Sequence, residues 1–504
     1  MHKIIPERTE LAYLDACELT NLIRKGKLSA RELMHSYLKQ LSLFNPKVNA
    51  IIDHLDEDIA LKMAEEADRQ LARGDRIGPL HGIPLAAKEM LEVKGWKQTF
   101  CWAAGVNEAD LSAMGLNELL EEDGLLAGRM REAGVLYVGK TNIPEFAFGS
   151  HTKNRLYGVS RNPYDLRKSV GGSSGGAAAA LASGIVSIAD GSDLGGSLRN
   201  PAAFCNVIGF RPSIGRIPSK EAGWAARMGT EGPMARSVDD IALLFSVQAG
   251  PYKDDPLSIQ ESGDIFREIV KKDHRGIRIG WTEDFGHLAV EDEVRKVGKQ
   301  ALRYFEDIGA EISEAHPDIM RSEPDKGILD AMSVFRTQRT VSLGCNVVAF
   351  QNALGEAGIR KFMGPIAQYQ MLDAYEKVNA FDIYKANENR HRIYREFMNF
   401  FEEYDFLICP TTQVLPFDVE WDFVEKIGDT EMEDYLEWMS ICCILSTVGL
   451  PIISMPCGFS KQGLPVGIQI IGKPQEDLQV LQLAKAFESA NEMSAKFNPP
   501  AISF

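Results

Sequence analysis

Residues 170–202 decide the fold, and they read VGGSSGGAAAALASGIVSIADGSDLGGSLRNPA. Two glycine-rich segments enclose an alanine-rich run at 177–182, which predicts a helix because alanine is the strongest helix former. The β-branched run at 185–189 predicts a strand. Glycine lets a backbone approach a bound group closely and adopt positive φ. The two glycine-rich segments therefore predict loops whose N–H groups face a negatively charged centre.

Helix and strand patterns alternate on both sides of this stretch. Apolar residues at helical spacing predict helices within 11–43, broken near Gly26 with Ser29 as N-cap, and over 59–73. A helix is also expected over 290–308. Short apolar runs predict strands at 83–87, 277–281, 311–312, 407–410, 452–456 and 465–472. This alternation predicts an α/β protein with helices on both faces of a mixed sheet.

Composition excludes several classes of function. The net charge of −16 argues against a nucleic-acid or anionic-membrane surface, because phosphates need a basic patch. The N-terminus lacks the apolar core of a secretory signal, and no run of apolar residues is long enough to span a membrane. The eight cysteines form no CxxC pair, so we expect reduced, buried thiols and a cytoplasmic location. The nine histidines form no HExxH pattern, and neither a metal nor a cofactor is expected.

Three serines in the two loops are candidate nucleophiles: Ser173, Ser174 and Ser197. Residues 172–176 match GxSxG, which would select Ser174 and require a downstream histidine, from His274, His287, His316 and His391. The phosphate-binding pattern GxxxxGK[ST] is absent here. A separate SxxK match at Ser150–Lys153 lacks its companion motifs and is treated as accidental.

The two glycine-rich loops resemble those of the amidase signature family. The resemblance rests on residues 171–177 and 189–202, and on further matches at 81–89, 139–146, 209–215, 449–451 and 463–469. It covers most of the chain and is weakest over 318–400. It implies one amidase domain over 1–504, with a mixed, mostly parallel central sheet. Residues 1–75 would form an N-terminal helical part, and 318–405 a helical lobe or lid over the active site.

The resemblance also implies roles for individual residues. Ser197 would be the nucleophile, Ser173 the relay that follows a cis peptide, and Lys88 the base. The two serines lie 24 residues apart, as in the family. The remaining roles go to the oxyanion-hole N–H groups of Leu194, Gly195, Gly196 and Ser197, and to the supporting residues Ser174, Asp193 and Arg199.

Elementary chemistry supports this triad. A serine hydroxyl is a weak nucleophile until a base takes its proton. A free lysine has a pKa of about 10.4 and is protonated at neutral pH, but burial lowers the pKa. Because a hydroxyl both donates and accepts, Ser173 can pass a proton from Ser197 to Lys88.

The sequence departs from the family pattern in three places. Glu89 stands where the family has Asp, and whether its longer carboxylate orients Lys88 through hydrogen bonds stays open; Ser192 replaces a Thr. The segment 96–124 is longer than usual. Two interpretations of it stay open, a substrate rim or a surface insertion, and its larger side chains are Phe100, Cys101, Trp102 and Met114.

The substrate prediction depends on Met439. The glutaminase component of glutamine-dependent tRNA amidotransferase, its A subunit, has an acidic residue ten positions before its Gly-Leu-Pro motif. This chain has Met439 there, in an apolar stretch with Trp438 and Cys442. An apolar site does not bind a free ammonium group. We therefore expect a small-molecule substrate, a linear aryl or hydrophobic amide, cleaved through an acyl-enzyme on Ser197, with esters also accepted. The alternatives are a plain core helix at 438–445 and the glutaminase role in an amidotransferase complex, and a homodimer is left open.

Overall fold

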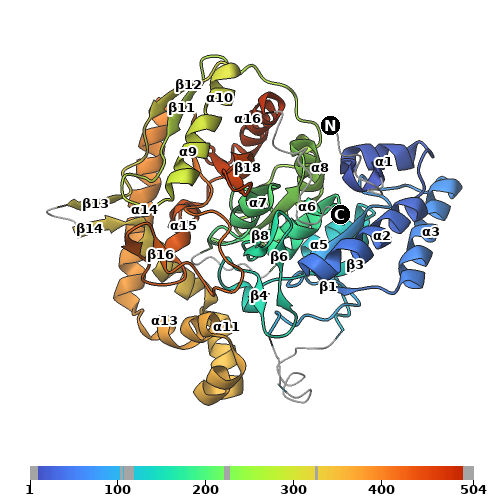
Figure 1. Ribbon diagram of the computed structural model, residues 1–504, viewed down its shortest axis with the longest axis horizontal. Coiled ribbons are helices and arrows are strands. Elements are labelled where there is room, and N and C mark those ends of the chain that lie inside the picture. The colour runs from blue at the N-terminus through green and yellow to red at the C-terminus, as the bar shows by residue number, and fades with distance from the viewer. Residues whose placement is uncertain (1–9, 103–105, 107–118, 221–226, 324–326, 492–504) are drawn as a thin grey trace.

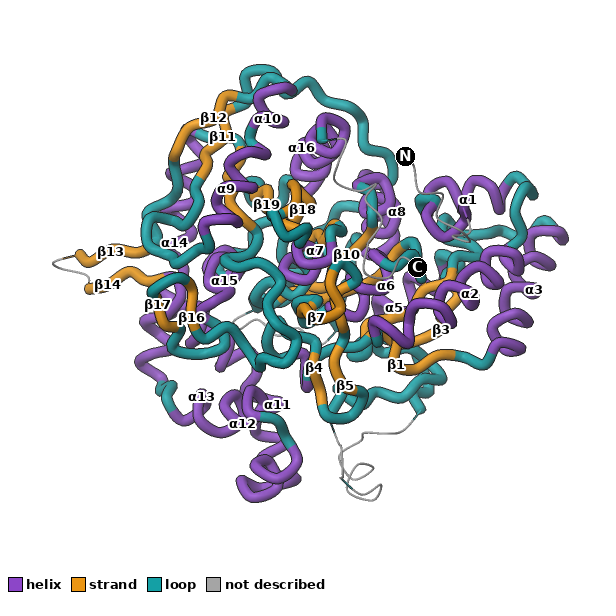
Figure 2. The backbone as a smooth tube through the Cα atoms, in the orientation of Figure 1, coloured by secondary structure: helices purple, strands orange, loops and turns teal. Residues whose placement is uncertain are grey.

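The computed structural model describes residues 10–102, 106, 119–220, 227–323 and 327–491 (Figure 1). Its centre is an eight-stranded sheet with the strand order β12-β11-β15-β19-β18-β9-β10-β8. The strands are β8 (Ile188–Asp193), β9 (Ile208–Arg211), β10 (Thr230–Ala235), β11 (Arg278–Trp281), β12 (Glu311–Glu314), β15 (Phe406–Pro410), β18 (Ile452–Phe459) and β19 (Pro465–Ile471). Figure 2 shows these strands crossing the middle of the molecule, with helices outside them.

The α/β class and the mixed sheet are confirmed, but the prediction that most strands pair in parallel is wrong. Among the described residues, only β12–β11 and β11–β15 are parallel pairs in this sheet, and the other five pairs are antiparallel. A parallel pair needs a crossover of a dozen or more residues. Residues 460–464 join β18 to β19 directly, so these strands can only form a hairpin.

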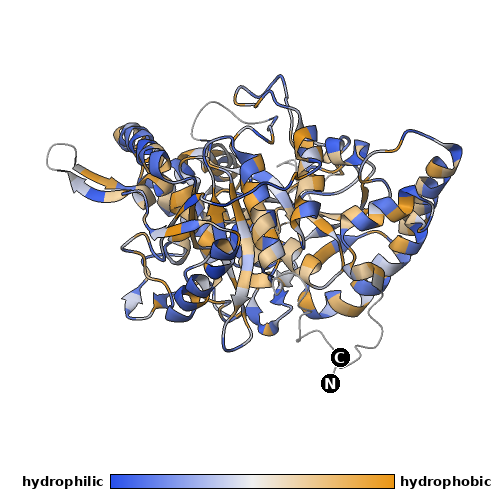
Figure 3. Cartoon of the chain, turned by 90° about the horizontal axis from the view of Figure 1, so that it is seen from above, coloured by the Kyte–Doolittle hydropathy of each residue, from blue (hydrophilic) through white to orange (hydrophobic). Residues whose placement is uncertain are grey.

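Helices pack against this sheet and enclose its core. α7 (Arg199–Cys205) contacts β9, β18 and β19, while α8 (Val238–Gln248) contacts β10. α9 (Asp292–Ala301) and α16 (Asp477–Ala490) both contact β18. The helix expected over 290–308 is divided at Leu302 into α9 and α10 (Arg303–Asp307). Figure 3 shows apolar residues gathered in the central elements and hydrophilic residues on the outer ones.

A second, three-stranded sheet carries the predicted lysine. It has the order β1-β3-β2, from β1 (Ile51–His54), β3 (Leu136–Thr141) and β2 (Pro84–Lys88). The N-terminal helices α1 (Ala16–Arg24), α2 (Ala30–Val48) and α3 (Glu57–Arg73) follow the predicted ranges closely. The break between α1 and α2 and the N-cap at Ser29 are confirmed, since the Ser29 side chain accepts from the Glu32 N–H in a capping box.

Helix α6 (Gly175–Ala182) contacts strands of both sheets, and all of its residues except Leu181 are glycine or alanine. All eight of its residues are buried. A Cβ on Gly176 would lie 2.3 Å from the Asn142 nitrogen and 2.6 Å from the Ala50 carbonyl oxygen. The backbone of the helix therefore packs directly against the backbone next to β1 and β3.

The strand predicted at 185–189 is displaced along the chain. β8 begins at Ile188 and continues to Asp193, because it pairs with β10 from Ile188↔Ala235 to Asp193↔Thr230. Pairing with a neighbouring strand, rather than β-propensity, fixes where this strand begins. The shift places Asp190, Ser192 and Asp193 on the strand instead of in a loop.

Residues 318–405 are mainly helical, as predicted, but begin with a hairpin. β13 (Met320–Glu323) and β14 (Gly327–Asp330) pair antiparallel and extend away from the body of the molecule (Figure 1). The helices that follow are α11 (Ala331–Phe362), α12 (Pro365–Gln368), the π-helical turn η4 (Tyr369–Asp373), α13 (Ala374–Glu376) and α14 (Ala380–Glu403). α11 packs against α14 and against α15 (Ser440–Ser446).

In the described part of the chain, no helix combines the length and the apolar content needed to cross a membrane. Seven cysteines are free thiols there, and six of them are buried.

Candidate active site

The predicted lysine is buried among three serine hydroxyls. Lys88 is the last residue of β2 and is 1% exposed. Its Nζ donates to Ser173 Oγ at 2.8 Å, to Ser174 Oγ at 2.9 Å and to Ser192 Oγ at 2.8 Å. Burial lowers the pKa of Lys88 from 10.5 to about 8, although Asp190, Asp193 and Glu231 oppose the shift. The amine can therefore lose its proton near neutral pH.

Asp190 holds the strand that carries this lysine. Its Oδ1 accepts the Lys88 backbone N–H at 3.0 Å, and the side chain is buried. Burial raises the pKa of Asp190 to about 6, although Lys140 and Lys88 oppose the shift. This bond connects β2 to β8 across the two sheets.

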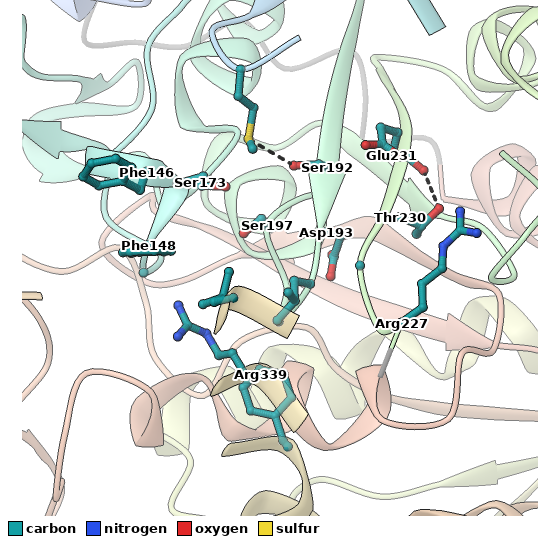
Figure 4. A pocket seen from close by; sticks show the side chains of 18 of the residues that line it. Phe146, Phe148, Ser173, Ser192, Asp193, Ser197, Arg227, Thr230, Glu231 and Arg339 are labelled. Atoms are coloured by element: carbon teal, nitrogen blue, oxygen red, sulfur yellow. Dashed lines mark hydrogen bonds between the residues drawn. The ribbon is translucent and has the colours of Figure 1, made fainter. Parts of the chain in front are cut away.

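The two glycine-rich loops bring Ser173 and Ser197 to one cavity. The peptide bond Gly172–Ser173 is cis, and Ser174 immediately precedes α6. The Ser174 N–H donates to the Ser197 carbonyl at 3.2 Å, which joins the loops. Ser173 and Ser197 both line a cavity of about 280 Å³, and Figure 4 draws both hydroxyl groups in its wall.

A buried ionic cluster holds the loop of Ser197. Arg199 donates to both carboxylate oxygens of Asp193 at 3.0 Å, and Arg211 lies 3.5 Å from Asp193 Oδ1. All three side chains are fully buried. Burial favours a raised pKa for Asp193, but Arg199 and Arg211 outweigh it and hold the pKa well below its usual range.

The same carboxylate determines which N–H groups of the loop remain available. Asp193 accepts the Gly196 N–H at 2.8 Å and the Leu198 N–H at 3.1 Å. Gly196, predicted as an oxyanion donor, thus has its N–H directed to Asp193. The N–H groups of Gly195 and Ser197 have no acceptor among the described residues and adjoin the cavity.

The cavity wall is largely apolar. Its apolar side chains are Met90, Phe146, Phe148, Leu194, Phe335, Leu343 and Met439, and its polar ones besides the two serines are Ser192, Asp193, Ser219, Arg227, Thr230, Glu231 and Arg339. Phe335, Arg339 and Leu343 come from α11. An aryl or alkyl group therefore finds apolar surface beside Ser197.

Of the three predicted pocket residues, the structure places only Met439 in this wall. Trp438 is buried instead against the rings of Phe204 and Phe417, with centroids 6.3 Å and 5.2 Å away. Cys442 lies behind Gly196, and its Sγ donates to the Thr411 carbonyl at 3.1 Å. Short helices present only one face to a cavity, so neighbours in sequence do not share it.

The carboxylate of Glu89 contacts Thr99 and not Lys88. Its Oε1 accepts the Thr99 hydroxyl at 2.7 Å and the Thr99 N–H, rather than orienting Lys88. The segment after Thr99 supports the cavity from behind. Phe100 accepts the Phe146 N–H at 2.9 Å, and the fully buried Trp102 packs on Phe146 with centroids 5.3 Å apart. Met114 lies outside the described residues.

Three residues at this site were not predicted to be site residues from the sequence: Ser192, Phe335 and Arg339. Ser192 contacts Lys88 directly. Once β8 is placed at 188–193, Ser192 lies two residues after Asp190 and on the same face of the strand, and this spacing could have indicated the contact. Arg339 and Phe335 lie on α11, far from any motif.

The rival motifs do not form sites. Ser150 Oγ donates to the Gly172 carbonyl at 2.8 Å, whereas Lys153 pairs with Asp422 at the surface. His274, His287, His316 and His391 are absent from the residues that line the cavity. Within the described ranges, no group of three His, Cys, Asp or Glu side chains could hold a metal ion.

Comparison with known proteins defines the class of enzyme. The family model named Amidase matches residues 32–481. The chain is 32% identical over 493 residues to an acylamidase from Rhodococcus erythropolis, covering 96% of this chain and 97% of that protein. It is 34% identical over 500 residues to the A subunit of the glutamyl-tRNA(Gln) amidotransferase of Moorella thermoacetica, covering 96% and 98%.

The fold agrees with this relationship. A crystal structure of a bacterial aryl acylamidase of the amidase signature family superposes with a TM-score of 0.87 at 28% identity, covering 98% of this chain and 99% of that one. The chain therefore belongs to the amidase family and is an amide-hydrolysing enzyme.

Proposed function

We propose that this enzyme hydrolyses a small-molecule carboxylic amide with an apolar acyl or amine part, through an acyl-enzyme on Ser197. The observation that carries the proposal is the 2.8 Å contact of buried Lys88 Nζ with Ser173 Oγ beside the cavity lined by Ser197. A lysine in this position can act as a base only when it is neutral, and its burial favours that form.

In the acylation step, Ser197 Oγ attacks the carbonyl carbon of the amide. Its proton passes to Ser173 Oγ while the Ser173 proton passes to Lys88 Nζ, which becomes an ammonium group. The carbonyl oxygen takes the electron pair and is held by the N–H groups of Gly195 and Ser197. Each such donor contributes roughly 10²–10³ in rate.

The tetrahedral intermediate then collapses. The C–N bond breaks, and the leaving nitrogen receives the proton that Lys88 returns through Ser173. Water attacks the acyl-enzyme by the same relay and releases the acid and free Ser197. Esters react by the same steps, since their leaving oxygen needs less protonation.

The cavity supports an apolar substrate. Met439, Phe335 and Phe148 give the wall beside Ser197 an apolar surface, which suits an aryl or alkyl group. Similarity to the amidotransferase component favours a second candidate, hydrolysis of glutamine as one member of a complex.

We further propose that residues 318–405 form a lobe that covers the site. Three side chains of α11, Phe335, Arg339 and Leu343, line the cavity and support this proposal.

The test uses the purified chain alone. We expect hydrolysis of aryl and alkyl amides and of the matching esters, and little or no release of ammonia from glutamine. Ser197→Ala, assayed beside the wild type, should be inactive on all of them. Turnover of glutamine but not of aryl amides would contradict the proposal and support the second candidate.

A further inference from the structure

Arg339 is a buried cation in the wall of the catalytic cavity. It lies on α11, is 6% exposed, and lines the same cavity as Ser197. Figure 4 draws its guanidinium group below Phe148, on the opposite side of the cavity from Glu231. The charge is thus available to a molecule bound next to the nucleophile.

The protein contacts of Arg339 leave its charge without a counterion. Nη1 donates to Gln370 Oε1, and the guanidinium carbon lies 5.3 Å and 5.7 Å from the ring centroids of Phe148 and Tyr435. Among the described residues, no carboxylate forms an ion pair with it, and neither Nε nor Nη2 has an acceptor. A buried charge is costly unless it is paired.

Neighbouring arginines are paired, which makes this one different. Arg336, three residues earlier on α11, pairs with Asp434. Arg227, also in the cavity wall, donates to Asp255 Oδ2 at 2.6 Å. Packing in this region therefore supplies carboxylates to other guanidinium groups but not to Arg339.

We propose that Arg339 binds a carboxylate of the substrate, so that the preferred substrates are amides carrying a carboxylate separated from the scissile bond by an apolar spacer. This inference rests on the proposed function. A guanidinium group offers parallel N–H donors that match both oxygens of a carboxylate. The rings of Phe148 and Tyr435 hold its plane, and the apolar wall of Phe335, Leu343 and Met439 suits the spacer.

The far wall does not oppose this orientation. Asp193 and Glu231 are the acidic side chains that line the cavity, and Asp193 is already paired with Arg199 and Arg211. Burial raises the pKa of Glu231, with Arg227 and Lys88 opposing the shift. Figure 4 draws Arg339 and Glu231 on opposite sides of the cavity, so a substrate carboxylate placed at Arg339 stays away from Glu231.

Matched anilides test the proposal. The first pair is the 4-nitroanilide of butyric acid and the mono-4-nitroanilide of glutaric acid, which differ by a carboxylate on the acyl side. The second pair is N-butyrylaniline and N-butyryl-4-aminobenzoate, which differ on the amine side. We expect kcat/KM to favour the carboxylate by about tenfold or more in one pair, which also identifies the side that faces Arg339.

Variants connect the preference to the residue. Arg339→Gln should reduce the ratio of kcat/KM for the charged over the neutral substrate by about tenfold or more, and Arg339→Lys should reduce it less. Arg336→Gln, on the same helix, should leave the ratio within about twofold of the wild type. Ratios are used because a general loss of folded enzyme affects both substrates equally.

Four outcomes would overturn the inference. A ratio near one in both pairs, or a ratio that Arg339→Gln leaves unchanged, shows that Arg339 is structural while amide hydrolysis itself stands. A preference for the γ-4-nitroanilide of glutamic acid over the glutaric compound rejects the apolar spacer. If none of these anilides is hydrolysed, the proposed function fails as well.

Discussion

Two basic side chains at the cavity, Lys88 and Arg339, lie in different environments. Around Lys88, three hydroxyls from Ser173, Ser174 and Ser192 surround the amine and its pKa falls. On α11, Arg339 meets one amide and two rings. Lysine loses its charge readily when buried, whereas arginine keeps it. We propose that the first region moves a proton and that the second keeps a fixed charge facing the substrate.

The largest effect should come from the catalytic region. Ser197→Ala removes the nucleophile, and we expect kcat/KM for an aryl amide to fall by about 10⁴-fold or more. Labelling by a fluorophosphonate should be lost with it. Ser42→Ala, at an exposed serine of α2, is the matched control and should behave as wild type. Retention of labelling by the Ser197 variant would show that another residue is the nucleophile.

The ionic cluster behind Ser197 should give the next largest effect. Asp193→Asn leaves Arg199 and Arg211 buried without their carboxylate, so the free energy of unfolding should fall by about 3–5 kcal/mol. Urea denaturation measures it. Asp165→Asn, which removes the partner of the exposed Arg167, should cost about 1 kcal/mol or less. Equal losses in the two variants would contradict the role given to burial.

The pH dependence should come from Lys88. In the proposed mechanism the neutral amine is the active form. Because its pKa is about 8, kcat/KM should rise with pH and level off above about pH 9. Between pH 6 and pH 9 the rise should be about 100-fold, because the neutral fraction of the amine increases about tenfold for each pH unit below the pKa and levels off above it. Initial rates across this range, with activity restored at pH 8 after each incubation, measure it. A flat or falling profile would rule out a neutral lysine as base.

The α11 wall should give the smallest effect. Leu343→Ala removes apolar surface that contacts bound substrate, so KM for a hydrophobic anilide should rise about three- to tenfold with kcat nearly unchanged. Val348→Ala, at a more exposed position of α11 outside the cavity, should change neither constant. A fall in kcat for Leu343→Ala would mean that this wall also positions the reacting atoms.

The two regions also differed in how well the sequence predicted them. Lys88, Ser173 and Ser197 lie in motifs because close backbone approaches and fixed hydroxyls restrict which residues can stand there. Arg339 and Phe335 belong to a helix whose pattern is only amphipathic, so nothing local distinguishes a cavity residue from a core one. Their position depends on how α11 packs against α15, which no short segment encodes.

The prediction that most strands are parallel was wrong for a related reason. The apolar runs at 452–456 and 465–472 located β18 and β19, but a run of apolar residues does not state its direction. The five-residue connection 460–464 is too short for a parallel crossover and therefore predicts an antiparallel pair. The length of a connection thus predicts strand direction where periodicity does not. Similarly, the role of Glu89 depends on a neighbour, Thr99, that lies in the segment 96–124, which is longer than usual in the family.

The close packing of α6 against the main chain limits which stabilising substitutions this enzyme can accept. Replacing a helical glycine with alanine commonly stabilises a protein by about 0.4–1 kcal/mol when the site is compatible. At Gly176 the added methyl group would press on the main chain at Ala50 and Asn142, which cannot rotate aside as a side chain can. The helix would shift away from these strands, and Ser173, the proposed relay two residues before it, would shift too. A thermostabilised variant of this enzyme must therefore keep glycine at this position, whatever helix propensity recommends.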